Sequence, residues 1–182
     1  VFNNGQTTAN FRVAGTGSAN TLFVDGGTNK VGIGTGNPGN LIEVAGSAPI
    51  VEINATAGSP ELQFSDGGID EFSIQYDTGA NALKFVEGGV GAHLTIKDGG
   101  NVGIGVTPEA WTAFNPVLRI KNASTGGGGA LASSGIDNFR MFTNAYYDGV
   151  YKRLDTGLAT QYGQESGAHV WSTAATGAGA ST

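Results

Sequence analysis

The side chains that most often carry catalysis or bind metals are few in this sequence. Its two histidines, His93 and His169, lie far apart and have no metal-ligand spacing around them. There is no cysteine, which excludes disulfides, thiolate metal sites and a cysteine nucleophile. No serine lies in a nucleophile-elbow motif. These observations predict that the protein is not an enzyme and holds no cofactor.

Carboxylates are the most numerous reactive groups, and most of them lie close to glycines in predicted turns. Glycoside hydrolysis needs two carboxylates facing each other across a sugar bond, but the neighbours Asp70 and Glu71 would point to opposite faces of a strand. Asp25, Asp66 and Asp98 would form rings of oxygen ligands for a hard cation if three chains met on one axis. The alternative, which we favour, is that they accept hydrogen bonds from turn amides.

The glycine-rich segment 32–36 (GIGTG) is not a phosphate-binding loop. It lacks the G-x-G-x-x-G spacing, no Gly-Lys-Ser/Thr occurs in the chain, and no long helix is predicted after it. Because its glycines alternate with Val31 and Ile33, one face of this strand is bare backbone. We expect that face to pack closely against a neighbouring chain.

Composition excludes several classes of protein. The 182 residues include 32 glycines, only 13% are charged, and the net charge is −6. An acidic chain with scattered cations has no attraction for a phosphate backbone, so we expect no nucleic-acid partner. No apolar stretch is long enough for a membrane-spanning helix. The two ends do not resemble natural termini, and we interpret the chain as a segment of a longer protein.

Short alternations of apolar and polar residues predict about a dozen strands. The strands are expected at residues 51–54, 62–65, 72–76, 83–85, 118–121, 139–142, 151–154 and 169–172, besides those of the repeats described below. An acidic residue followed by two glycines, at 25–27, 66–68, 87–89 and 98–100, predicts a hairpin turn at each position. Residues 108–114 are expected to form one helical turn. The chain is therefore predicted to be all-β with short strands.

One strand–turn–strand pattern occurs twice, at residues 22–35 (LFVDGGTNKVGIGT) and 94–106 (LTIKDGGNVGIGV). In both copies a proline follows, Pro38 or Pro108, and then a short apolar strand at 41–44 or 118–120. Repetition of this kind favours an elongated, modular architecture. We divide the chain into a first repeat (1–46), an intervening β module (47–93), a second repeat (94–123), a glycine-rich linker (124–129) and a C-terminal β segment (130–182).

Strands this short cannot bury enough surface in pairs to offset their ordering entropy. A closed barrel, a sandwich, or the pooling of strands from several chains around an axis would each solve this problem. The glycine content favours pooling, because glycine lets backbones approach closely at a crowded axis.

Aromatic residues are concentrated in the last part of the chain: Phe139, Phe142, Tyr146, Tyr147, Tyr151, Tyr162 and Trp171. We favour the interpretation that these rings fill a core between chains in which leucine is scarce. The alternative is contact with a receptor, because exposed Tyr and Trp present rigid amphipathic faces to sugars and proteins. The candidates for receptor binding are Tyr146, Tyr147, Tyr151 and Trp171.

Residues 30–35 and their second copy, 101–105, together with Pro38 and Pro108, resemble the repeat of bacteriophage tail fibres and related large surface proteins. Residues 11–25 resemble the lead-in strand of these repeats, and residues 144–149, with Tyr162 and 169–171, resemble a segment common in phage fibres. Only two copies of the repeat occur, which leaves room for a small module between them. The residues of the repeat that are expected to shape its turns are Gly32, Gly34, Gly103, Gly105, Pro38 and Pro108.

The resemblance implies an elongated, fibrous homotrimer, intertwined or side by side, located in the tail fibre of a virion. Its partners would be other tail or baseplate proteins and a bacterial surface glycan or outer-membrane protein. Its function would be structural, with a role in host attachment. Three alternatives share parts of the pattern: a decoration or baseplate protein without a receptor, a glycan-depolymerising tailspike, and a segment of a bacterial surface adhesin.

Overall fold

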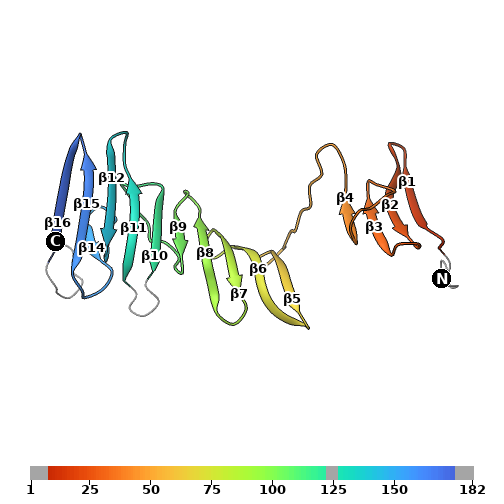
Figure 1. The fold of residues 1–182 in the computed structure, drawn as a ribbon, viewed down its shortest axis with the longest axis horizontal. Coiled ribbons are helices and arrows are strands. Elements are labelled where there is room, and N and C mark those ends of the chain that lie inside the picture. The colour runs from red at the N-terminus through yellow and green to blue at the C-terminus, as the bar shows by residue number, and fades with distance from the viewer. Residues whose placement is uncertain (1–7, 122–126, 175–182) are drawn as a thin grey trace. The chain divides into compact units, whose positions relative to one another are not determined.

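The computed structural model describes residues 8–121 and 127–174, which form sixteen β-strands and no helix (Figure 1). The chain divides into two compact units, Val1–Glu52 and Ile53–Thr182. Within these described ranges, no helix could span a membrane. The all-β prediction is confirmed. Both main sheets are open, so the strands are not gathered into a closed barrel.

The first unit contains a four-stranded sheet in the order β1-β2-β3-β4. The strands are β1 (Phe11–Gly15), β2 (Ser18–Asp25), β3 (Lys30–Ile33) and β4 (Ile42–Val44). β1, β2 and β3 are antiparallel neighbours, whereas β4 pairs with β3 in parallel. The chain between β3 and β4 must therefore return to the start of β3 before it adds the next strand.

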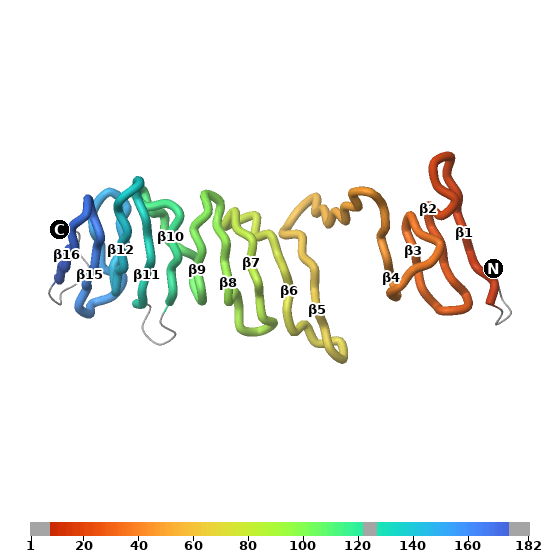
Figure 2. The backbone as a smooth tube through the Cα atoms, turned by 45° about the horizontal axis from the view of Figure 1, so that its top comes forward, coloured from red at the N-terminus to blue at the C-terminus, as the bar shows by residue number. Residues whose placement is uncertain are grey.

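The second unit contains a ten-stranded open sheet in the order β16-β15-β12-β11-β10-β9-β8-β7-β6-β5, in which successive strands largely follow chain order (Figure 2). Its strands are β5 (Glu61–Asp66), β6 (Ile69–Asp77), β7 (Ala82–Glu87), β8 (Gly91–Lys97), β9 (Val102–Ile104), β10 (Val117–Lys121), β11 (Gly128–Ser133), β12 (Asn138–Thr143), β15 (Ala159–Glu165) and β16 (Ala168–Ala174). A separate hairpin pairs β13 (Ala145–Tyr147) with β14 (Tyr151–Arg153).

The two copies of the repeat fold in the same way. In each copy a hairpin, β2–β3 or β8–β9, is followed by a parallel strand, β4 or β10. Gly32 lies between Phe23 and Glu43, and Gly103 lies between Thr95 and Arg119. The predicted order of strand, tight turn, strand and proline-containing loop is confirmed for both copies.

The glycines of the repeat make room for the chain's own loop and not for a neighbouring chain, which corrects our expectation. A Cβ atom at Gly32 would lie 2.4 Å from the Thr35 carbonyl oxygen. At Gly103 it would lie 2.1 Å from the Val106 carbonyl oxygen and 2.8 Å from Cδ of Pro108. The loop that leads to the parallel strand thus folds back over the glycine, and Pro108 is buried against it.

Gly34 and Gly105 follow the strand and turn the chain into this loop. Both have positive φ, 80° and 67°, which glycine adopts without strain. Their amides donate hydrogen bonds back to the preceding strand segment, to the carbonyl oxygens of Asn20 (2.9 Å) and His93 (2.8 Å). The second glycine of each copy therefore ends the strand at a defined residue.

We expect Gly103→Ala to lower the free energy of unfolding by about 2–3 kcal/mol, because backbone of the covering loop occupies the space that Cβ needs. The matched control is Gly163→Ala in β15, where the nearest atom to an added Cβ is Cγ of Arg140 at 3.6 Å. That change should stay within about 0.5 kcal/mol of wild type. Urea denaturation of both variants measures the difference, and equal stabilities would contradict the tight approach at Gly103.

All four acidic-Gly-Gly turns are confirmed: they connect β2 to β3, β5 to β6, β7 to β8, and β8 to β9. The strand predicted at 51–54 is wrong, because these residues lie in a segment without strand partners. The helical turn predicted at 108–114 is also wrong, because that segment is an irregular loop over β9.

The ten-stranded sheet runs across the divisions that we drew from the sequence. The boundary between residues 93 and 94 falls inside β8. Of the linker expected at 124–129, residues 124–126 lie outside the described residues, and Gly128 and Gly129 belong to β11.

Candidate interaction surfaces

One face of the ten-stranded sheet carries two rows of apolar side chains, which we call the apolar face. Directly paired residues of neighbouring strands project to the same side, so the strand registers define each row. One row contains Leu62, Ile74, Phe85, Leu94, Ile104 and Ile120; the other contains Tyr76, Leu83, Ile96, Val102, Leu118, Leu131, Met141, Tyr162 and Trp171. Ten of these side chains are exposed in the single chain, from 37% at Ile96 to 79% at Trp171.

The first unit repeats this arrangement on a smaller scale. Phe11, Val24, Val31 and Ile42 form one row across β1 to β4, and Val13, Leu22, Ile33 and Val44 form the next. Phe11, Val13, Ile33 and Ile42 expose between 39% and 70% of their surface. Each copy of the repeat therefore contributes an equivalent three-strand block of apolar residues to one face of its sheet.

The opposite face of the ten-stranded sheet is covered over part of its width. The described core cluster consists of Trp111, Phe114, Val117, Ala130, Ala132, Phe142, Ala145 and Ala159, with Tyr146 and Tyr147 packed against it. Trp111 and Phe114 come from the loop between β9 and β10 and lie 5.2 Å and 5.6 Å, centroid to centroid, from Phe142 on β12. Small alanines beneath these rings let the loop and the β13–β14 hairpin lie close to the sheet.

The four predicted receptor-binding aromatics are separated by the sheet. Tyr146 and Tyr147 are partly buried in the core cluster, and Tyr151 packs edge-on against Tyr147 at 4.9 Å while remaining 40% exposed. Trp171 lies on the apolar face, 4.5 Å from the ring of Tyr162. The first three therefore belong to a hairpin on the covered face, and only Trp171 belongs to the exposed one.

Sequence reasoning missed Trp111 and Phe114 as core residues. They follow Pro108 in a segment without β-alternation, so the pattern gave no reason to place them over a sheet. One signal would have indicated a covering loop: two aromatic residues follow the proline of the repeat within a few positions of the sequence.

The covering loop of the second repeat is held by a buried cation. Arg119 has no exposed side-chain surface, and its Nη1 donates to the carbonyl oxygens of Ile120 (2.6 Å) and Gly129 (3.4 Å). Its Nε lies 3.4 Å from Oε2 of Glu109 in the loop. In the first repeat the equivalent position is Glu43, whose carboxylate accepts the Gly39 amide at 2.6 Å. The two copies thus fasten the same loop with side chains of opposite charge.

The carboxylate of Asp25 organises the backbone of its own turn. Asp25 Oδ1 accepts the amides of Gly27 and Thr28, and Oδ2 accepts the Thr28 hydroxyl at 2.7 Å. The hydroxyl of Thr28 and the Gly27 amide lower the pKa of Asp25. Among the described residues no group of three His, Asp or Glu side chains is placed to hold a metal within one chain. A ring of Asp25, Asp66 or Asp98 across several chains stays a prediction.

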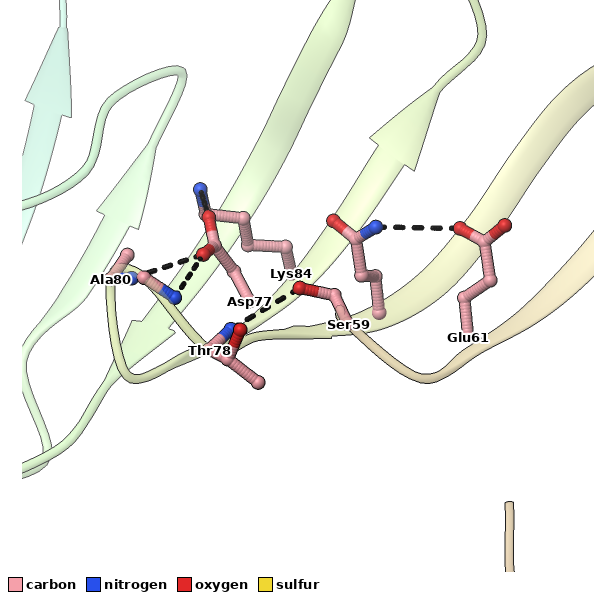
Figure 3. A network of polar contacts seen from close by, with 8 residues as sticks. Ser59, Glu61, Asp77, Thr78, Ala80 and Lys84 are labelled. Atoms are coloured by element: carbon pink, nitrogen blue, oxygen red, sulfur yellow. Dashed lines mark hydrogen bonds and ion pairs between the residues drawn. The ribbon is translucent and has the colours of Figure 1, made fainter. Parts of the chain in front are cut away.

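Asp77 closes the β6–β7 turn in the same way (Figure 3). Its Oδ1 accepts the amides of Gly79 (2.9 Å) and Ala80 (3.0 Å), and its Oδ2 lies 2.5 Å from Nζ of Lys84. Asn29 and Asn81 stand four residues after Asp25 and Asp77, and both have positive φ. The spacing Asp-x-x-x-Asn therefore marks both turns. The acidic-Gly-Gly pattern predicted only the turn at Asp25, because Asp77 is followed by Thr78 and Gly79.

The hydrogen bond from Lys84, with those from the turn amides, lowers the pKa of Asp77 below its ordinary value of 3.8. A lowered folded-state pKa stabilises the protein above the unfolded value, and this contribution disappears as the pH falls through the folded pKa. We expect Asp77→Asn to be less stable than wild type near neutral pH, and the difference to shrink between about pH 4 and pH 2. Thermal unfolding across this range measures it; a difference independent of pH would contradict the ionic contact.

The two histidines lie in different surroundings. His93 on β8 contacts the carboxylate of Glu87, and its ring lies 6.4 Å from that of Phe72. His169 on β16 forms a hydrogen bond through Nδ1 with the Tyr162 hydroxyl at 2.5 Å, and the two rings are stacked. The structure does not bring the two imidazoles together, so they cannot act as a pair within one chain.

No protein-family model matches the chain, and no curated protein matches it in sequence.

Proposed function

We propose that this chain is a structural segment of a homotrimeric bacteriophage tail fibre that takes part in attachment to a bacterial surface. The proposal rests on two observations: the apolar face of the ten-stranded sheet, and the equivalent rows of exposed apolar residues on the four-stranded sheet of the first unit. The resemblance of the two glycine repeats to those of tail fibres supports the phage origin and the number of chains.

An uncovered apolar face of this size needs a partner. Monomeric proteins rarely expose contiguous apolar patches larger than a few hundred Å². Here exposed apolar residues occur on nine of the ten strands of the sheet in the second unit, all except β15. The core cluster on the covered face consists largely of alanines and a few rings, whereas ten larger apolar side chains of the described rows on the opposite face are exposed.

Copies of the same chain fit this face, because each copy supplies the same rows of apolar residues. Closed rotational symmetry brings identical faces together around an axis, and three sheets would enclose a triangular apolar interior. The covered face with its aromatic hairpin would then point outwards. Three outward surfaces on one particle would also gain avidity for a repetitive bacterial surface.

Adsorption to bacteria tests the attachment role. Fluorescently labelled chain should bind saturably to a subset of strains in a diverse panel and should release no reducing ends from their surface polysaccharides. Release of reducing ends would favour the depolymerase alternative, and a trimer that adsorbs to no strain would contradict the attachment role. Heat-denatured labelled chain is the control for non-specific adhesion.

A further inference from the structure

The two main sheets have four edge strands, β1, β4, β5 and β16 (Figure 1). An edge strand presents a row of unpaired amides and carbonyl oxygens, which proteins usually protect with charged side chains, bulges or a very short strand. β1 carries Arg12 and β5 carries Glu61 and Asp66, and the register of both strands is irregular. β4 has only three residues, one of them Glu43. Three of the four edges are therefore protected.

β16 lacks all of these protections. Its seven residues, AHVWSTA, include no Asp, Glu, Lys, Arg or Pro. Each of them pairs with a residue of β15, and the register contains no bulge. In the part of the chain that the structure describes, no strand pairs with the other edge of β16. β16 is therefore the regular, uncharged edge that is best suited to the addition of another strand.

The turn between β15 and β16 defines which backbone groups lie along the free edge. Its central residues, 166–167, both have positive φ, 50° and 79°, as in a type I′ turn. The pair that closes such a hairpin is hydrogen-bonded, and bonded pairs then alternate with non-bonded ones. The amides and carbonyl oxygens of His169, Trp171 and Thr173 therefore point away from β15. The 4.5 Å between the rings of Tyr162 and Trp171 agrees with this assignment, because side chains approach closely in non-bonded pairs.

The side chains of β16 define the kind of strand that fits beside it. Trp171 ends the row of the apolar face that contains Met141 and Tyr162, so an apolar residue opposite Trp171 would extend that row. Val170 and Ser172 project to the other face, where small or polar residues fit. Contacts through the apolar face would leave the edge unoccupied, because its backbone groups lie in the plane of the sheet.

We propose that β16 accepts a β-strand from a different protein. The partner segment is extended and uncharged, and it alternates apolar residues with small polar ones. Backbone hydrogen bonds to the free edge supply affinity, and the residue beside Trp171 supplies specificity. The edge is present in the single chain, so the site goes beyond the proposed function. Only the choice of a different protein over a second copy rests on the proposed trimer, because threefold symmetry cannot pair three copies of one edge two by two.

Binding of a fluorescent strand peptide to the purified chain tests this edge. The probe is Thr-Val-Thr-Leu-Thr-Val-Thr, N-methylated at every second residue so that only one of its edges can pair. The same peptide N-methylated at every residue is the control. Fluorescence anisotropy should show saturable binding of the probe and no binding of the control peptide.

Substitutions at Thr173 locate the bound peptide. Thr173→Pro should weaken binding by about tenfold, because it removes an outward amide that β15 does not use. Thr173→Lys keeps the amide and places a protecting charge on the edge, so it should also weaken binding if the proline variant does not fold. The matched control, Thr173→Val, keeps the amide and a β-branched side chain and should bind as wild type does.

Light scattering on each sample separates the outcomes. Wild-type chain that binds neither peptide, or binds both equally, overturns the proposal, and so does binding that Thr173→Pro and Thr173→Lys both retain. A particle of twice the trimer mass that Thr173→Pro halves would assign the edge to a second copy and overturn the choice of partner. A monomeric chain that binds the probe through this edge would contradict the trimer and leave the edge site standing.

Discussion

Leu131→Glu is expected to convert the assembled particle into single chains. Leu131 lies within a row of the apolar face, between Leu118 and Met141, and is already 38% exposed in the chain alone. The substitution therefore costs the isolated fold little. In an assembly it would bring identical carboxylates together in an apolar interior, where each uncompensated charge costs several kcal/mol.

The matched control is Ser172→Glu, which adds the same charge at an exposed position on the opposite side of the sheet. Multi-angle light scattering should give the single-chain mass for Leu131→Glu and the wild-type mass for Ser172→Glu, with unchanged far-ultraviolet circular dichroism in both. An assembled Leu131→Glu particle of wild-type mass would show that the apolar face is not the contact between chains.

Arg119→Ala is expected to lower the free energy of unfolding by about 3–5 kcal/mol, the cost typical of breaking a buried ion pair from one side. The substitution removes a fully buried guanidinium and leaves Oε2 of Glu109, which is also buried, without its cation. It also leaves the carbonyl oxygens of Ile120 and Gly129 without these donors.

The double variant Arg119→Met with Glu109→Gln separates charge from packing. It keeps most of the buried side-chain volume and removes both charges, so it should recover a large part of the loss seen in Arg119→Ala. Urea denaturation followed by tryptophan fluorescence, with the exposed Trp171 replaced by Phe in every protein, measures the loss because Trp111 then reports on the core beside the covering loop. Full stability of Arg119→Ala would contradict the role of this cation in fastening the loop.

The sequence predicted the local geometry of the sheets well where turn chemistry decides it. An acidic residue followed by two glycines marks four hairpins. In three of these turns glycine adopts the positive φ that the turn requires, whereas in the β2–β3 turn Asn29 adopts it. The alternating segments at 62–65, 72–76 and 118–121 became strands because each has a strand on at least one side to pair with. Residues 51–54 alternate equally well but have no such neighbour, and they form no strand.

Structure that depends on small residues was not predicted correctly. β11 begins with glycines and continues through Ala130 and Ala132, so it resembled a linker, although the alanines are required beneath the rings of the core. The glycines of the repeat were correctly expected at a close approach, but the partner was misassigned. Nothing in the local pattern distinguishes the chain's own loop from a second chain, since both present backbone atoms to Gly32 and Gly103.

The candidate surfaces were predicted only in part. Tyr146, Tyr147, Tyr151 and Trp171 were grouped because they are close in sequence, but strand register places Trp171 on the face opposite the hairpin. The surface hollow lined by Asp137 and His169 was not predicted, because these two residues become neighbours only through the pairing of β12 with β15 and β15 with β16. Cross-strand neighbours of this kind cannot be read from spacing along the chain.

The solution mass of the wild-type chain, measured by multi-angle light scattering over a range of concentrations, tests the central claim most directly. A mass of three times 18.4 kDa is the predicted result, because three apolar faces would then cover one another. A folded monomer of 18.4 kDa that stays monomeric as its concentration rises would contradict the claim that copies of this chain meet through the apolar face.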